Sequence, residues 1–134
     1  MAGCIFCAIV EGSAPAEVVD ADEHTVAFMD INPATAGHAL VVPRRHIADL
    51  WDMTVDLAGP LMTAVHRLAG RMRDRLTPEG LNLLQSTRAA AFQTVFHLHV
   101  HLIPRYSGDT IRLPWTPSPG DPAQINAVAE RLRG

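Results

Sequence analysis

The segment TVFHLHVHLIPR, from Thr94 to Arg105, restricts the fold more than any other part of this sequence. Histidine occupies alternate positions within an otherwise apolar run. Because successive side chains of a strand point to opposite faces, this alternation predicts a strand over Thr94–Ile103. One face then carries three imidazoles about 6.5–7 Å apart, those of His97, His99 and His101. The other face is expected to meet a helix through Phe96, Leu98, Val100 and Leu102.

A long amphipathic helix is predicted over about Asp56 to Leu76. Its apolar stripe recurs at steps of three or four: Leu57, Leu61, Val65, Leu68, Met72 and Leu76. Pro60 fits a helix only near the first turn, so the helix is expected to begin with Asp56 as its cap. Further strands are predicted over His24–Ile31, His38–Pro43 and Leu81–Ser86, with short helices at His46–Met53 and about Pro122–Leu132. Strands that flank one long helix predict an α+β fold with an antiparallel sheet covered on one face.

Length and composition limit the remaining classes of protein. The 134 residues, 48% of them apolar, suit one domain over 1–134, with an irregular C-terminal tail from about 107. A formal charge of −3 without a basic stripe argues against nucleic acid binding. No apolar run reaches the roughly 18 residues of a membrane span, and the apolar start has no cationic leader. A cytoplasmic protein with reduced Cys4 and Cys7 and no membrane partner is therefore expected.

The histidine row is hard to explain by packing alone, because each buried ring has two nitrogens that need partners. Two functional interpretations remain open from the spacing. Histidines two apart on a strand can chelate a metal ion. Alternatively, one neutral imidazole attacks phosphorus and forms a covalent intermediate, while the others position it or handle protons.

The segment HLHVHLIPR resembles the signature of the histidine triad (HIT) superfamily of nucleotide hydrolases and transferases. The segments CIFCAIVEGSAPAEVV, FMDINPATAGHALVVPRRHI and LNLLQ resemble the same family, in order, from Cys4 to about Tyr106. The similarity is closest to the Hint-like branch and its bacterial members. It implies a HIT-like fold: an antiparallel sheet of about five strands with one long and one short helix, extended edge to edge across a homodimer. The tail with Trp115 is then expected to reach the partner's pocket.

The resemblance also implies a role for each site residue. His99 would attack the α-phosphorus of a purine nucleoside phosphoramidate or related nucleotide, and water would then release the nucleoside monophosphate. His101 would bind a phosphate oxygen or protonate the leaving group, with His97 and His38 beside it in the catalytic group. The substrate would also contact Asp30 through its ribose hydroxyls, Phe28 and Ile31 through its base, and Ser86, Gln93 and Thr94 through the phosphate loop.

That loop departs from the family pattern. This chain has QSTRAAAFQ where family members often have QNNGRAAGQ. Ser86 replaces an Asn that usually contacts the nucleotide, and Phe92 replaces a Gly. A side chain at that Gly position disfavours a positive φ and could crowd the phosphate. The loop therefore leaves the substrate range more open than the chemistry.

Cys4 and Cys7 form a C-x-x-C pair near the N-terminus. A redox role would want a thioredoxin-like βαβ context, which the pattern lacks, whereas two buried thiols remain a fair alternative. The resemblance to bacterial Hint-like proteins with this CIFC start implies a structural zinc, with His46 and His97 completing a Cys₂His₂ set. His97 would then bind zinc through one ring nitrogen and face the active-site network through the other. No metal is expected in the chemistry itself.

The leading hypothesis is a purine nucleoside phosphoramidase, similar to adenosine 5'-monophosphoramidase, that acts through His99. A dinucleoside polyphosphate hydrolase or nucleotidyl transferase is the alternative within the enzymes. A nucleotide-binding protein with little turnover is the alternative outside them, and Ser86 and Phe92 keep it open.

Overall fold

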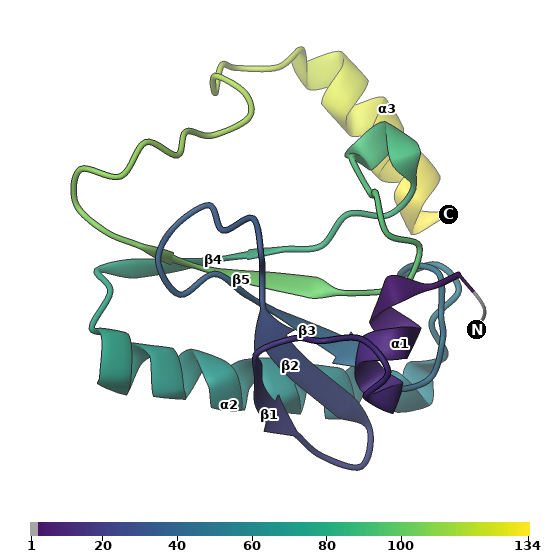
Figure 1. Ribbon diagram of the computed structural model, residues 1–134. Helices are drawn as coiled ribbons and strands as arrows, with labels where there is room; N and C mark the ends of the chain where they lie inside the picture. Colours follow the sequence, from purple (N-terminus) through teal and green to yellow (C-terminus); the bar gives the residue numbers. More distant parts are fainter. Residues whose placement is uncertain (1–2) are drawn as a thin grey trace.

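The computed structural model describes residues 3–134, and a five-stranded antiparallel sheet lies at the centre of this range (Figure 1). The sheet has the order β1-β2-β3-β5-β4 and consists of β1 (Val18–Ala21), β2 (Thr25–Met29), β3 (Ala39–Pro43), β4 (Gly80–Leu84) and β5 (Val100–Arg105). Its helices are α1 (Ile5–Glu11), α2 (Ala58–Leu76) and α3 (Pro122–Arg133). The predicted α+β class with a sheet of about five strands is confirmed. The helix α1 and the strand β1 were not predicted.

Both faces of the central strands are buried, because alternate residues of β2 and β3 pack into two separate clusters. On one face, Ala27 and Val41 lie in a cluster with the apolar stripe of α2. On the other face, Phe28 and Leu40 pack against Phe6 of α1. The sheet is therefore covered by α2 on one side and partly by α1 on the other, rather than on one face only.

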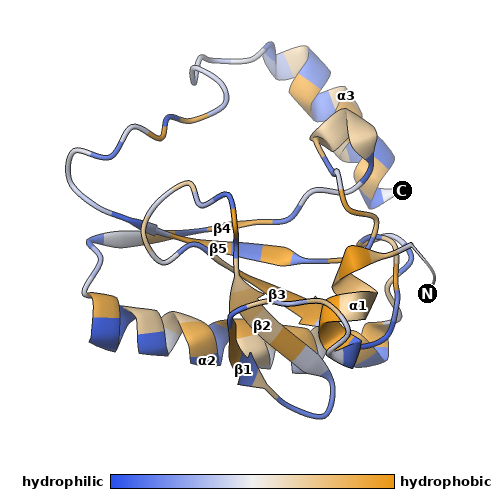
Figure 2. Cartoon of the chain, viewed as in Figure 1, coloured by the Kyte–Doolittle hydropathy of each residue, from blue (hydrophilic) through white to orange (hydrophobic). Residues whose placement is uncertain are grey.

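The long helix α2 follows the predicted apolar stripe. Leu61, Val65, Leu68 and Met72 are buried, and the hydrophobic side of the helix faces the sheet (Figure 2). Pro60 lies in the first turn, as expected. The predicted cap was wrong: a short 3₁₀ turn over Val55–Leu57 precedes the helix, so Asp56 lies inside that turn.

The histidine segment enters the sheet later than predicted. Strand β5 begins only at Val100, since its ladder with β3 ends where Val41 pairs with Val100. Upstream, the segment bonds to the chain that follows β3: the Leu98 N–H donates to the Ile47 carbonyl over 2.7 Å. Leu98, Val100 and Leu102 do face α2, but Phe96 is half exposed and the prediction for it was wrong.

The segment His46–Met53, predicted as a short helix, is instead irregular, with a turn over residues 50–52. Two of its carbonyl groups accept from distant parts of the chain, Ile47 from Leu98 and Ala48 from Gln93, while the Met53 N–H donates to the Leu50 carbonyl within the segment. The hairpin of β2 and β3 and the strand β4 agree with the predicted ranges within a few residues.

The C-terminal segment leaves the sheet after β5 and arches away from it before α3 (Figure 1). Residues 107–121 form neither helix nor strand, and α3 confirms the predicted helix near Pro122. The Asp121 side chain caps α3 by accepting from the Ala123 N–H. No residue of α3 is buried, and its apolar residues Ile125, Val128 and Leu132 are exposed. Within residues 3–134, no helix combines the length and the hydrophobicity that crossing a bilayer would take.

Candidate active site

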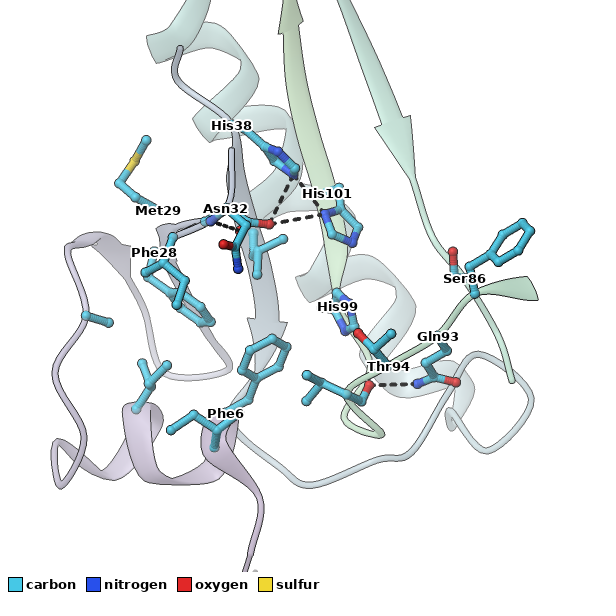
Figure 3. A pocket seen from close by; sticks show the side chains of 18 of the residues that line it. Phe6, Phe28, Met29, Asn32, His38, Ser86, Gln93, Thr94, His99 and His101 are labelled. Atoms are coloured by element: carbon cyan, nitrogen blue, oxygen red, sulfur yellow. Dashed lines mark hydrogen bonds and ion pairs between the residues drawn. The ribbon is translucent and has the colours of Figure 1, made fainter. Parts of the chain in front are cut away.

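A cavity of about 570 Å³ opens on the α1 side of the sheet and contains three histidines: one directly before β3, one in β5 and one directly before β5 (Figure 3). Its size is typical of a small-molecule site. Three of the four predicted catalytic histidines line it: His38, His99 and His101. All the other predicted substrate contacts line it too: Phe28, Asp30, Ile31, Ser86, Gln93 and Thr94. The fold thus gathers residues from 28 to 101 of the chain around one hollow.

The protonation state of His99 follows from its backbone partner. Its Nδ1 lies 2.7 Å from the carbonyl oxygen of His97, and a carbonyl oxygen can only accept. In the neutral ring Nδ1 therefore carries the proton, and Nε2 keeps a lone pair available to a ligand. Burial lowers the pKa of His99 below its usual 6.5, against smaller opposing effects of the His97 carbonyl and Asp30. An uncharged imidazole thus lines the cavity near neutral pH.

His38 and His101 form a second hydrogen-bonded unit. The Ala34 N–H donates to Nδ1 of His38 over 2.9 Å, so the proton of the neutral His38 ring lies on Nε2. That Nε2 is 2.8 Å from Nδ1 of His101, which must then accept. Nε2 of His101 consequently carries the N–H of its neutral ring. Burial, then the proximity of His99 and His38, lowers the pKa of His101 to about 4.

Asp30 lies against this histidine pair. Its Oδ2 is 3.4 Å from Nε2 of His38 and 3.8 Å from Nδ1 of His101, and its Oδ1 accepts from the Asn32 N–H. The resemblance implied a contact with ribose hydroxyls. The carboxylate lines the cavity and keeps lone pairs for such a contact. Its negative charge also favours protonation of the pair formed by His38 and His101.

His97 occupies a different place from the other histidines. It is fully buried, is not among the cavity-lining residues, and lies with Cys4, Cys7 and His46, whose ligand atoms are all within 4.8 Å of one another. The Nε2–H of His97 donates to the Pro43 carbonyl over 2.8 Å. The expectation that this second nitrogen faces the active-site network was therefore wrong. His97 meets the network through its backbone carbonyl, which fixes the tautomer of His99.

The loop from Ser86 to Thr94 forms the wall opposite Phe6 and Phe28 (Figure 3). Its Gln93 side chain is committed to structure: Oε1 accepts from the Arg88 N–H over 2.7 Å, and Nε2 donates to the Ala48 and Val95 carbonyls. The N–H groups of Phe92 and Gln93 are bonded to carbonyls within the loop. The Gln93 side chain and these two N–H groups are therefore engaged within the protein rather than directed at a ligand.

Two residues of the loop have glycine-like backbone conformations. Arg88 has φ 76° and ψ 161°, and Phe92 has φ 73° and ψ 19°. Both stand where the family pattern QNNGRAAGQ has Gly, the residue that adopts a positive φ without strain. The Arg88 guanidinium holds the loop by donating to the buried Asp49 over 2.6 Å and by lying over the ring of Trp51.

Several lining residues were not predicted. The far wall includes Phe6 and Ile9 of α1 and the following Pro15 and Ala16. The apolar spacing of Ile5, Phe6 and Ile9 could have suggested a short helix, but nothing in it pointed to a cavity. Asp49, which is not among the cavity-lining residues but supports the loop through Arg88, is 1% exposed and also carried no sequence signal.

Comparison with known proteins agrees with the fold. The family model described as the HIT domain matches residues 11–108. A solved member of the HIT family from Bacillus subtilis superposes with a TM-score of 0.91 at 37% identity, covering 98% of this chain and 95% of that one. A Zn-bound histidine triad family protein from Mycobacterium smegmatis has a TM-score of 0.78 at 39% identity, covering 87% and 84%. The adenosine 5'-monophosphoramidase hnt1 of Schizosaccharomyces pombe is 32% identical over 130 residues, 96% of this chain and 95% of that protein. By sequence and by fold, the chain belongs to the HIT family of nucleotide-binding hydrolases.

Proposed function

We propose that this protein hydrolyses purine nucleoside phosphoramidates at the α-phosphorus through a nucleotidyl intermediate on His99. The observation that carries the proposal is the hydrogen bond from Nδ1 of His99 to the His97 carbonyl, 2.7 Å long, inside the cavity. It leaves Nε2 unprotonated, and it can stabilise the positive charge that the ring acquires as Nε2 bonds to phosphorus. The phosphoramidase named above among the similar proteins supports the substrate class.

The first step forms the bond from Nε2 of His99 to phosphorus and breaks the P–N bond. The departing amine takes up one proton, and the hydrogen-bonded pair of His38 and His101 is placed to supply it from Nε2 of His101. The pair is uncharged in the free protein. An anionic phosphate in the cavity, together with Asp30, favours one added proton on the pair.

The second step reverses the roles. Water attacks phosphorus, the bond to Nε2 of His99 breaks, and His101 takes the proton that the water releases. The nucleoside monophosphate leaves with the oxygen of that water, and both histidines return to their starting states. The cavity supports the nucleoside end with apolar side chains of Phe6, Phe28 and Leu40, while Ile31 is 88% exposed at the rim.

The test is intact-protein mass spectrometry during turnover of adenosine 5'-phosphoramidate. We expect a transient added mass of one nucleoside monophosphate on the wild type and none on His99→Ala. His66→Ala, at an exposed position on α2, is the matched control and should keep both adduct and product. Saturable nucleotide binding without adduct or product in the wild type would instead identify a binding protein. Turnover of dinucleoside polyphosphates alone would identify the polyphosphate hydrolase.

A structural zinc at Cys4, Cys7, His46 and His97 is the second part of the proposal. Distances of 3.2–3.5 Å join Sγ of Cys7 to Nδ1 of His46 and each Sγ to Nδ1 of His97. They fit the edge of roughly 3.5 Å that a tetrahedron with Zn–S near 2.3 Å and Zn–N near 2.0–2.1 Å would have. The Pro43 carbonyl already holds the other nitrogen of His97, as is usual for a metal-bound histidine. A bound ion would cross-link the N-terminal segment to the chain after β3 and before β5.

Elemental analysis should find about one zinc per chain in the wild type, and a strong chelator should lower its melting temperature. Cys7→Ser should lose both the metal and the response to chelator. His24→Ala removes an exposed histidine outside the cluster and should change neither. Full occupancy by Cys7→Ser would contradict the proposed ligand set.

A homodimer joined through β4 is the third part. β4 is an edge of the sheet, and its Leu83 and Leu84 are 48% and 49% exposed. An exposed apolar edge strand offers unpaired backbone groups to a second copy. Light scattering at micromolar concentration should give the mass of two chains for the wild type and of one chain for Leu83→Lys. A monomeric wild type would contradict this arrangement.

A further inference from the structure

We propose that Phe92 forms a leaving-group subsite that selects substrates whose departing amine carries a flat aromatic ring. This inference rests on the proposed phosphoramidase function and specifies its substrate class. The side chain of Phe92 is 84% exposed, yet it lines the cavity beside Ser86, Gln93 and Thr94. A large ring exposed at the mouth of a pocket gains most by stacking on a ligand.

The backbone of Phe92 supports a role in binding rather than in folding. Its φ of 73° lies in the left-handed region, where a residue with a Cβ is strained and glycine is not. The ring is too exposed to offset this strain by burial in the core. The loop nevertheless keeps the shape, through the bonds of Arg88 to Gln93 and Asp49. Such local strain is typical of positions where the side chain serves a ligand.

The layout of the cavity decides which part of the substrate meets Phe92. Phe6 and Phe28 line one side, His99 and His101 lie between, and Ser86, Gln93 and Thr94 line the other side (Figure 3). Asp30, the proposed ribose contact, directly follows β2, the strand that carries Phe28. With the nucleoside there and phosphorus at His99, the leaving group extends toward the loop that carries Phe92. The nucleoside and the leaving group are separate substituents of the same phosphorus, so they extend from it in different directions.

Aromatic chemistry follows from what this wall offers. Phe92 supplies a π face without charge, and Ser86 and Thr94 supply only small neutral groups. The one charged side chain of the loop, that of Arg88, is turned elsewhere, since it is bound to Asp49 and lies over Trp51. A planar apolar amine is therefore favoured over ammonia or a charged amine.

The test compares kcat/KM for three adenosine phosphoramidates, whose leaving groups are ammonia, cyclohexylmethylamine and a benzylamine of similar size. Phe92→Ala should lower kcat/KM about tenfold for the benzylamine substrate and less than twofold for ammonia. Phe92→Tyr should restore the preference. Phe92→Gly should lose the preference while raising the melting temperature, because glycine relieves the left-handed strain. Val55 is 88% exposed and lies outside the cavity, so Val55→Ala is the control and should change neither the substrate preference nor the melting temperature.

An unchanged preference in Phe92→Ala would overturn the proposal. An equal loss of kcat/KM for all three substrates in Phe92→Ala would overturn it too. So would a mass of Phe92→Ala in light scattering that differs from that of the wild type, because the ring would then contact a second copy of the chain. If the wild type turns over none of the substrates, their binding to His99→Ala and to the His99→Ala, Phe92→Ala double variant decides. If the double variant binds only the benzylamine substrate more weakly than His99→Ala does, the subsite is supported and the phosphoramidase function is contradicted. If both variants bind all three substrates equally, both proposals are contradicted.

Discussion

The buried histidine pair makes the stability of this protein depend on pH in a way that one substitution can isolate. Burial, then His99 and His38, lowers the pKa of His101 from 6.5 to about 4. Above pH 6.5 the ring is neutral in both folded and unfolded chains. As the pH falls from 6.5 to about 4, the His101 ring binds a proton in the unfolded chain but stays neutral in the folded chain, so the free energy of unfolding falls. Below about 4 both are protonated and the loss levels off.

The size of this effect follows from the shift. At about 1.4 kcal/mol for each pH unit, a pKa lowered to about 4 corresponds to about 3 kcal/mol of stability lost between pH 7 and pH 4. His101→Gln removes the titrating group but keeps a polar side chain of comparable reach. The variant should be less stable at pH 7, because the bond from His38 is altered, yet its stability should fall less steeply with acid.

Urea unfolding at pH 7, 6, 5 and 4 measures the effect as the difference between the two pH profiles. Contributions from groups that do not contact His101, such as the Cys₂His₂ cluster, are shared by both proteins and cancel in that difference, whereas the neighbouring His38 and His99 lose one repulsive partner in the variant. His66→Gln, exposed on α2, is the control and should follow the wild type. Parallel profiles for wild type and His101→Gln would refute the reasoning, since the fold would then not hold this ring neutral.

Two further substitutions test the packing that supports the site. Leu102→Ala, at a position 0% exposed between β5 and α2, should cost roughly 3–4 kcal/mol in urea unfolding, and a cost below about 1 kcal/mol would show that the core collapses around the gap. Gly37→Ala should cost roughly 2–3 kcal/mol, because φ is 96° and a Cβ would lie 2.5 Å from Cδ1 of Leu76. Gly12→Ala, with φ 82° and nothing within 4 Å of the added carbon, separates the strain from the clash, and an equal cost at both positions would contradict the contact.

Local patterns in the sequence were enough for most of the secondary structure. The stripe of α2 and the hairpin of β2 and β3 follow from periodicities that depend on neighbouring residues alone. Where the prediction was wrong, the segment forms hydrogen bonds with residues far away in the sequence. The segment before β5 bonds to Ile47 and so joins the ladder only at Val100, and the same bonds keep His46–Met53 from forming a helix. Short elements such as α1 carry too few residues for a periodic signal.

By itself, the sequence determined which residue types could act here: three alternating histidines, a C-x-x-C pair, and a loop with side chains in place of glycines. Only the tertiary structure decided how these residues divide. It placed His97 with the cysteines and His46, turned His99 and His101 toward the cavity, and fixed which ring nitrogen of each carries a proton. The physical reason is that tautomer, burial and ligand grouping depend on partners such as the Pro43 and His97 carbonyls and the Ala34 N–H. Those partners come together only when β3, β5 and the loops between them have packed.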